Sequence, residues 1–392
     1  MTGRVGALAA IAALAAIALV APAAAGARVP QGFVGVVADG PVAEAGLDPS
    51  GELRTMVGTG VESVRIVFHW SDAQRYRRME DVPAAERPRY REIDGVPTTF
   101  AHLDPLIANA ARRRIRVLPV VTTAPGWAAK YPGQFASPPA RTDTYAAFVR
   151  ILVERYGPRG SFWRENPKLP HRPIRAWQIW NEANLRASWL EKRWPGPYAE
   201  LLRAARRAIK ATDRRARIVL SGFANYSWSS LAALYRVRGA RRLFDEVAIH
   251  PYTRDVPGLA TILGRVRHVM RRNGDRRKPM SVTEFGWTSA KGKTEGFGIE
   301  LTERGQARAA ARSLRLLARN RRRLGLRSAY WYNWAGRENP PGGSLFSYSG
   351  LRRVDPDGRW IAKPAQRAFR RTALRLRDCR RKAAIATRCA RR

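Results

Sequence analysis

The chain has 392 residues, a common size for a single large α/β barrel and more than one small core needs. Its 72 Lys and Arg residues against 31 Asp and Glu residues give a formal net charge of +41, which predicts attraction to polyanions. No nucleic-acid-binding motif is visible, and 63 of the basic residues are arginines scattered along predicted helix faces, so compositional bias is favoured over a dedicated binding surface.

The first 26 residues have the pattern of a secretory signal peptide. Arg4 precedes an apolar stretch from Val5 to Val20, and small residues near Ala25 offer an A-x-A cleavage site. A retained membrane anchor is the alternative, although the apolar run is rich in alanine and near the lower length limit for a spanning helix. No other stretch could cross a bilayer. We therefore expect a secreted protein of the extracellular space or cell envelope, where an anionic envelope polysaccharide is a possible partner and nucleic acid is not expected.

Eight short runs rich in β-branched residues predict strands, and segments of helical periodicity such as 142–157 and 302–325 separate them. Eight strands that alternate with helices predict a closed (β/α)8 barrel over residues 27–375. An open doubly wound sheet is the alternative, but the first strand lacks a glycine-rich phosphate loop. The predicted strands cover residues 32–38, 61–68, 115–121, 174–180, 216–222, 246–250, 280–285 and 328–334.

Polar and aromatic side chains gather where the predicted strands end, which is the catalytic face of such barrels. A long segment from Ser71 to Phe100 follows the second strand, and we expect it to form a wall or lid over this rim. The candidate site residues, in chain order, are Arg65, His69, Trp127, Asn181, Glu182, His250, Tyr252, Glu284 and Trp331.

Glu182 and Glu284 follow the fourth and seventh strands and could face each other across the barrel mouth. A glycosidase needs such a pair, because one carboxylic acid protonates the leaving oxygen while the other carboxylate attacks the anomeric carbon in retaining enzymes. Arg65 is the candidate cation beside Glu284, and the apolar neighbours of Glu182 would help to keep it protonated. A single glutamate at a strand end is more often a helix N-terminal residue than a catalytic one, so the prediction depends on the presence of both glutamates.

The segment "WQIWNEANLRASW" resembles the W-N-E-P-N-L segment of the clan A retaining glycoside hydrolases, especially family 39, and "VTEFGWTS" resembles their nucleophile strand. The resemblance covers roughly residues 32–371 and extends to family 5-like relatives, with Ala183 in place of the usual proline. It implies that Glu182 is the acid/base and Glu284 the nucleophile.

The same resemblance implies binding roles for other candidates. Asn181 would bind the sugar 2-hydroxyl, and Tyr252 and Arg65 would hold the nucleophile. His250 would line the site, and Trp331 would form a stacking floor under the sugar. His69 could bind a sugar hydroxyl or cap its loop, and Trp127 could bind substrate or belong to the core.

Competing chemistries fail on spacing. The segment "GWTSAKGKT" has one residue too many for a phosphate-binding loop, the five histidines include no close ligand pair for zinc, and no G-x-S-x-G elbow is present. We therefore expect no metal and no cofactor. The sequence favours a secreted retaining O-glycosyl hydrolase acting on a β-linked carbohydrate substrate. Transglycosylation and a noncatalytic polysaccharide-binding barrel remain the alternatives.

The remaining prediction concerns a basic tail at residues 376–392. Its Cys379 and Cys389 are the only cysteines of the chain, and an oxidising compartment favours a disulfide between them over two free thiols.

Overall fold

The computed structural model describes residues 28–42, 49–294, 296–338 and 344–377. The expected signal peptide at residues 1–26 and the expected disulfide between Cys379 and Cys389 lie outside the described residues. Within the described part of the chain, no helix is both long enough and apolar enough to span a membrane.

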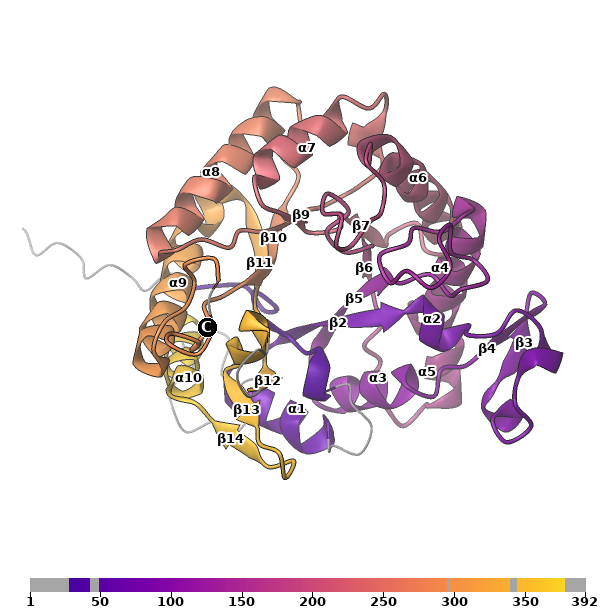
Figure 1. Cartoon of the computed structure of the whole chain (residues 1–392), viewed down its shortest axis with the longest axis horizontal. Coiled ribbons are helices and arrows are strands. Elements are labelled where there is room, and N and C mark those ends of the chain that lie inside the picture. Colours follow the sequence, from indigo (N-terminus) through magenta and orange to yellow (C-terminus); the bar gives the residue numbers. More distant parts are fainter. Residues whose placement is uncertain (1–27, 43–48, 295, 339–343, 378–392) are drawn as a thin grey trace, which may run out of the picture.

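Parallel strands form the centre of the molecule, in the order β7-β6-β5-β2-β1-β11-β10-β9-β8 (Figure 1). A parallel bridge between Val219 of β7 and Glu246, the residue before β9, closes the sheet, together with a hydrogen bond of 3.1 Å from Leu220 N to Glu246 O. The prediction of a (β/α)8 barrel is therefore confirmed, with the fifth strand split into β7 and β8. The strands are β1 (Val34–Val37), β2 (Ser63–His69), β5 (Arg116–Thr122), β6 (Ala176–Ile179), β7 (Arg217–Val219), β8 (Phe223–Ala224), β9 (Val247–His250), β10 (Met280–Phe285) and β11 (Leu326–Trp331).

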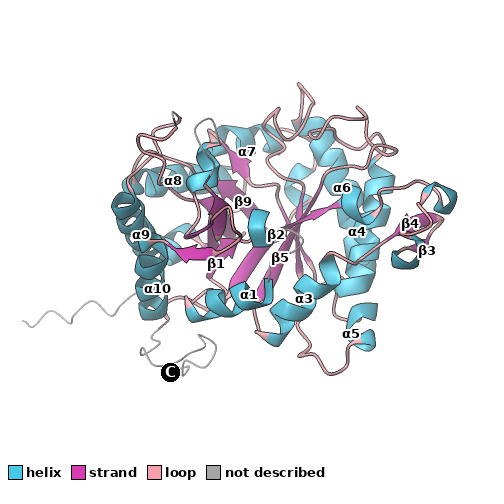
Figure 2. Ribbon diagram, turned by 60° about the horizontal axis from the view of Figure 1, so that its bottom comes forward, coloured by secondary structure: helices cyan, strands magenta, loops and turns pink. Residues whose placement is uncertain are grey.

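Helices surround the strands on the outside of the barrel (Figure 2). On α9, the alanines and leucines at positions 309, 310, 314, 317 and 318 are buried against the barrel, whereas Arg315 and Arg319 are exposed. This separation explains how the barrel carries so many arginines without burying their charge. The longer helices are α1 (Pro49–Gly58), α3 (Leu103–Arg112), α4 (Thr142–Tyr156), α6 (Pro195–Thr212), α7 (Ser227–Tyr235), α8 (Val256–Arg272), α9 (Glu303–Leu324) and α10 (Pro364–Leu376).

The segment expected to form a wall or lid instead projects from the side of the barrel (Figure 2). It contains the short α2 (Trp70–Ala73), two 3-10 turns, η2 (Met79–Asp81) and η3 (Arg87–Arg89), and a hairpin of β3 (Arg91–Ile93) and β4 (Val96–Thr98). Ion pairs tie the hairpin to neighbouring helices: Asp94 pairs with Arg150 of α4, and Arg91 lies 3.6 Å from Glu165 of α5 (Ser161–Glu165). These contacts hold the hairpin at the side of the barrel, so the hairpin does not form the expected lid, whereas Gln74 near the start of the segment contacts Trp127 at the rim.

A small sheet follows β11 and lies beside the barrel mouth. It consists of β12 (Ala335–Arg337), β13 (Arg352–Val354) and β14 (Trp360–Ala362), with the 3-10 turn η5 (Leu345–Tyr348) between the first two. The buried Lys363 Nζ donates to Glu338 Oε1 at 2.8 Å, to Ser289 Oγ at 2.7 Å and to Tyr348 O at 3.0 Å. One ammonium group therefore anchors η5 to both the small sheet and the barrel.

We predict that Lys363→Met lowers the free energy of unfolding by about 2 to 3 kcal/mol, because it removes the buried ammonium group and leaves Glu338, Ser289 and Tyr348 O without one of their donors. Urea denaturation followed by circular dichroism measures the change. Lys291→Met is the matched control, since the Lys291 side chain is exposed. Equal midpoints for the two variants would contradict a structural role for Lys363.

Candidate active site

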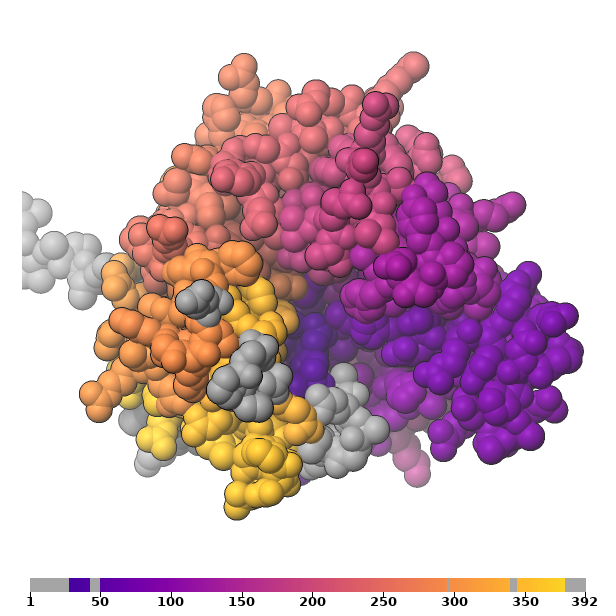
Figure 3. All heavy atoms as spheres, viewed as in Figure 1, coloured from indigo at the N-terminus to yellow at the C-terminus, as the bar shows by residue number. Residues whose placement is uncertain are grey.

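The predicted site residues come together at the carboxyl ends of the strands, the face seen in Figure 1. Figure 3 shows this face hollowed at its centre, where atoms of the amino-terminal part of the barrel lie at the bottom. Arg65 comes from β2, His250 ends β9, Glu284 lies in β10, and Glu182 follows β6. Residues up to 219 positions apart in the chain thus meet in one place.

Glu284 is held by two donors. Arg65 Nη1 donates to its Oε1 at 2.7 Å, and the Tyr252 hydroxyl donates to its Oε2 at 2.8 Å. Arg65 is itself only 1% exposed, and its other nitrogens donate to Gln178 Oε1 at 2.9 Å and to Asn181 Oδ1 at 2.7 Å. The planar guanidinium therefore fixes the carboxylate and Asn181 relative to each other.

The backbone turns sharply at the end of β6 and thereby places Glu182. Trp180 and Glu182 both have positive φ angles, of 66° and 41°, which non-glycine residues rarely adopt. The Glu182 N–H donates to Ser221 O at 2.7 Å, and the Ala183 N–H lies 3.3 Å from Ser221 Oγ. A proline at position 183, as in the W-N-E-P-N-L segment, would lack that N–H donor. Ala183 therefore makes a hydrogen bond that a proline could not make.

The two carboxylates lie close together with an imidazole between them. His250 Nδ1 is 2.7 Å from Glu182 Oε1 and 3.6 Å from Glu284 Oε2. One oxygen of each carboxylate and one nitrogen of His250 lie within 4.8 Å of one another. Retaining glycosidases hold their two carboxyl groups at a similarly short separation of roughly 5 Å, whereas inverting enzymes keep them farther apart to admit the attacking water. The same three groups could ligate a cation, but the positive charge of Arg65 against Glu284 disfavours one there.

Burial gives the acid/base candidate an unusual proton affinity. It raises the pKa of Glu182 to about 7, with the charge of Arg65 acting in the opposite direction. Burial also lowers the pKa of His250 to about 3, against the attraction of Glu284, so this imidazole is neutral at physiological pH.

The neutral imidazole carries its proton on Nδ1. His250 Nε2 is buried and has no hydrogen-bond partner among the described residues. An unpaired buried N–H costs more than an unpaired acceptor, so the proton belongs on Nδ1, from which it donates to Glu182 Oε1. Gly222 completes this arrangement, since a Cβ there would lie 2.2 Å from Nε2. His250 therefore orients the Glu182 carboxyl group without competing for its proton.

Two further candidates lie at the rim after β2 and β5. His69 Nδ1 is 2.9 Å from Thr123 Oγ1, and its half-buried ring lies 6.4 Å from the ring of Phe135, which is 70% exposed. Trp127 is also half-buried, and its indole N–H donates to Gln74 O at 2.8 Å. Both rings therefore keep exposed surface, and their contacts with substrate stay a prediction.

Trp331 does not fit the predicted stacking role. Its ring is fully buried against Phe285 and Trp287, and its indole N–H donates to Ser349 O at 3.1 Å. The neighbouring Tyr332 keeps exposed surface instead and packs edge-on against Tyr252, with ring centres 6.4 Å apart. Burial, and after it the charge of Glu284, raises the pKa of Tyr332.

The strand period of two could have identified Tyr332. Ser328 bonds with Ser281 inside the barrel, at 2.8 Å between the two hydroxyl oxygens, so alternate residues 330 and 332 share its inward face. Trp331 falls on the outward face. The prediction for Trp331 is based on its residue type and does not take into account on which face of the strand it lies.

Comparison with solved structures agrees with this architecture. A monomeric β-xylosidase from Caulobacter crescentus CB15 superposes with a TM-score of 0.60 at 19% identity, covering 87% of this chain and 67% of the other. A family 39 glycoside hydrolase from Bacteroides cellulosilyticus WH2 gives a TM-score of 0.62 at 18% identity, covering 90% and 65%. The chain has the barrel fold of these glycoside hydrolases.

An exo-β-1,4-mannosidase from Opitutaceae bacterium strain TAV5 shares the fold as well, with a TM-score of 0.59 at 18% identity over 90% of this chain and 62% of that one. The chain thus spans about two thirds of the length of these relatives. Neither a protein-family model nor a curated protein sequence matches it.

We predict that Glu182 titrates near pH 7, because burial penalises its charged form. The protonated carboxyl dominates below that pH and the carboxylate above it. Difference infrared spectroscopy between about pH 5 and pH 9 follows the C=O stretch of protonated carboxyls. The component that disappears near pH 7 should be absent from Glu182→Gln. A component that persists unchanged in this variant would contradict the assignment.

Proposed function

We propose that the chain is a retaining glycoside hydrolase that cleaves a β-linked glycoside or polysaccharide, with Glu284 as nucleophile and Glu182 as acid/base. One observation carries the proposal: two carboxyl groups lie within 4.8 Å in opposite surroundings. Glu284 faces a fixed positive charge, whereas burial raises the pKa of Glu182 to about 7. A noncatalytic binding barrel has no need of such a pair.

In the first step, a Glu284 carboxylate oxygen attacks the anomeric carbon while Glu182 gives its proton to the leaving oxygen. The glycosidic C–O bond breaks, and a glycosyl ester forms on Glu284. In the second step, Glu182, now ionised, takes a proton from water as the water oxygen attacks the same carbon. The ester bond breaks, the sugar leaves with retained configuration, and both carboxyl groups regain their initial states.

The surrounding charges support this change of role. Formation of the ester removes the negative charge of Glu284, while Arg65 keeps its positive charge. Arg65 already acts to lower the pKa of Glu182, so its unopposed charge favours the ionised form that the second step requires. His250 donates to Glu182 Oε1 throughout and holds the carboxyl group toward the leaving oxygen.

Polar groups that make no hydrogen bond to the described residues are candidates for contacts with the substrate. Asn181 Oδ1 accepts from Arg65, whereas Asn181 Nδ2 has no partner among the described residues and is half-buried beside the pair. We assign it to the sugar 2-hydroxyl, where a hydrogen bond strengthens as charge develops in the transition state. Tyr332 takes the place of Trp331 as the aromatic surface under the sugar, and His69 and Trp127 lie where a leaving group would emerge.

The relatives support the β-linked substrate class. Their names include a β-xylosidase and an exo-β-1,4-mannosidase, which differ in sugar but share the β configuration. Export, and with it action on extracellular or envelope polysaccharide, is proposed from the signal-peptide pattern of residues 1–26.

We predict that Glu284→Gln lowers kcat/KM by about 10⁴-fold or more, because it removes the nucleophile. Glu182→Ala should retain far more activity on aryl glycosides whose leaving groups need no protonation, and added azide should restore turnover and give a β-glycosyl azide. Hydrolysis of a panel of nitrophenyl glycosides measures both effects.

The control variant is Glu200→Gln, which changes an exposed carboxylate on α6 and should leave the rate unchanged. Full activity of Glu284→Gln, or an α-glycosyl azide from Glu182→Ala, would contradict the proposed mechanism.

A further inference from the structure

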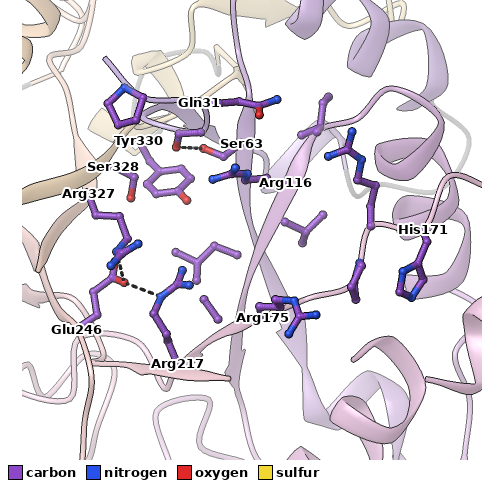
Figure 4. A pocket seen from close by; sticks show the side chains of 18 residues that line it. Gln31, Ser63, Arg116, His171, Arg175, Arg217, Glu246, Arg327, Ser328 and Tyr330 are labelled. Atoms are coloured by element: carbon purple, nitrogen blue, oxygen red, sulfur yellow. Dashed lines mark hydrogen bonds and ion pairs between the residues drawn. The ribbon is translucent and has the colours of Figure 1, made fainter. Parts of the chain in front are cut away.

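A second cavity, of about 720 Å³, is shown in Figure 4. Its lining lies where the strands begin, whereas the carboxylate pair lies where they end, so the two are at opposite ends of the barrel. Residues where strands begin line it, including Arg116 in β5, Arg217 in β7 and Arg327 in β11. Arg172 and Arg175, which precede β6, complete its basic lining. Glu246 is the single acidic residue of the lining, so the cavity carries a surplus of four positive charges.

Glu246 forms the floor of this cavity and is itself buried. It accepts a hydrogen bond from Ser281 Oγ, and it pairs with Arg217 Nε at 3.3 Å and Arg327 Nε at 3.1 Å (Figure 4). Both arginines use Nε for this contact. Neither has a hydrogen bond from its Nη groups to any residue that the structure describes. One carboxylate thus fixes two guanidinium groups while leaving their outer donors unused.

Arg116 and Arg175 are less closely neutralised than this pair. Arg116 has no ion pair within the described part of the chain, and it lies so close to Gly32 that a Cβ there would be 2.7 Å from Arg116 Nη1. Arg175 Nη1 is 4.0 Å from Asp213 Oδ2, beyond hydrogen-bond distance. Like charges brought together in a concave site raise the local potential, and a bound anion lowers it.

This arrangement differs from the arginine scatter on the helices. Arg315 and Arg319 of α9 are exposed on a helix surface, whereas Arg116, Arg217 and Arg327 come from separate strands and line one space together with Arg172 and Arg175. Ser63 and Ser328 add hydroxyl groups to the same lining. Convergence from distant parts of the chain is the mark of a binding site rather than of composition alone.

We propose that this cavity binds a multivalent oxyanion, a compound that carries two or more phosphate or carboxylate groups. The guanidinium fork matches the two oxygens of either group, and the surplus charge calls for more than one of them. The volume lies in the range of small-molecule sites and would hold a short anionic oligomer. The site is independent of the proposed catalytic function, because it shares no residue with the carboxylate pair.

Isothermal titration calorimetry on the full chain tests the proposal with two probes, sodium tripolyphosphate and tetragalacturonate. The test variant is Arg116→Gln/Arg175→Gln, and the control variant Arg207→Gln/Arg315→Gln removes two exposed charges from α6 and α9. We expect the test variant to weaken binding of at least one probe by about 10-fold or more, and the control variant by less than about 2-fold. Circular dichroism melting checks that each variant is folded, and single Arg116→Gln replaces the double variant if it is not.

The two probes distinguish the source of the anion. Binding of tripolyphosphate alone identifies a phosphate compound, whereas binding of tetragalacturonate identifies a carboxylated glycan. Equal weakening by the test and control variants would show a diffuse effect of the net charge and overturn the proposal. Failure of both probes to bind would overturn it as well.

Discussion

The ion pair between Arg65 and Glu284 is the constraint on which the rest of the site depends. A guanidinium that is 1% exposed must have acceptors for its donors, and Glu284, Gln178 and Asn181 supply them from β10, β6 and the turn after β6. Loss of either charge would leave the other buried without its partner, at a cost of about 3 to 5 kcal/mol. The interaction that orients the proposed nucleophile is thus also one that ties the barrel strands together.

The second carboxylate is placed by different means. Among the described residues Glu182 has no ion pair with an arginine or lysine, and it is positioned by a strained backbone turn and by a neutral imidazole. Burial raises the pKa of Glu182 to about 7, whereas Glu284 lies against the charge of Arg65. We propose opposite roles for two identical side chains because one lies against a charge and the other against apolar groups and a neutral donor.

Much of this arrangement can be predicted from the sequence, because it depends on order along the chain. The eight strands, the positions of both glutamates after them and the approach of Arg65 follow from periodicity and from barrel geometry. The choice between Trp331 and Tyr332 does not follow from residue type, since aromatic residues occupy both faces of β11. The path of residues 71–100 depends on ion pairs with α4 and α5, which no local pattern reveals.

The basic cavity could not be predicted from the sequence either. Arg116, Arg217 and Arg327 look like three of many arginines in the sequence, and only closure of the barrel brings them around Glu246. Part of the net charge of +41 is therefore concentrated in this cavity, and composition alone could not distinguish these arginines from those scattered on the helices.

Covalent trapping tests the central claim most directly. A panel of 2-deoxy-2-fluoro-β-glycosides with dinitrophenolate leaving groups, including the xyloside and the mannoside, slows breakdown of the glycosyl ester more than its formation. The account predicts that a matching sugar adds one glycosyl mass to the intact protein and that peptide mass spectrometry places it on Glu284. Turnover of the parent substrate with inverted configuration, or an adduct on any other residue, would contradict it.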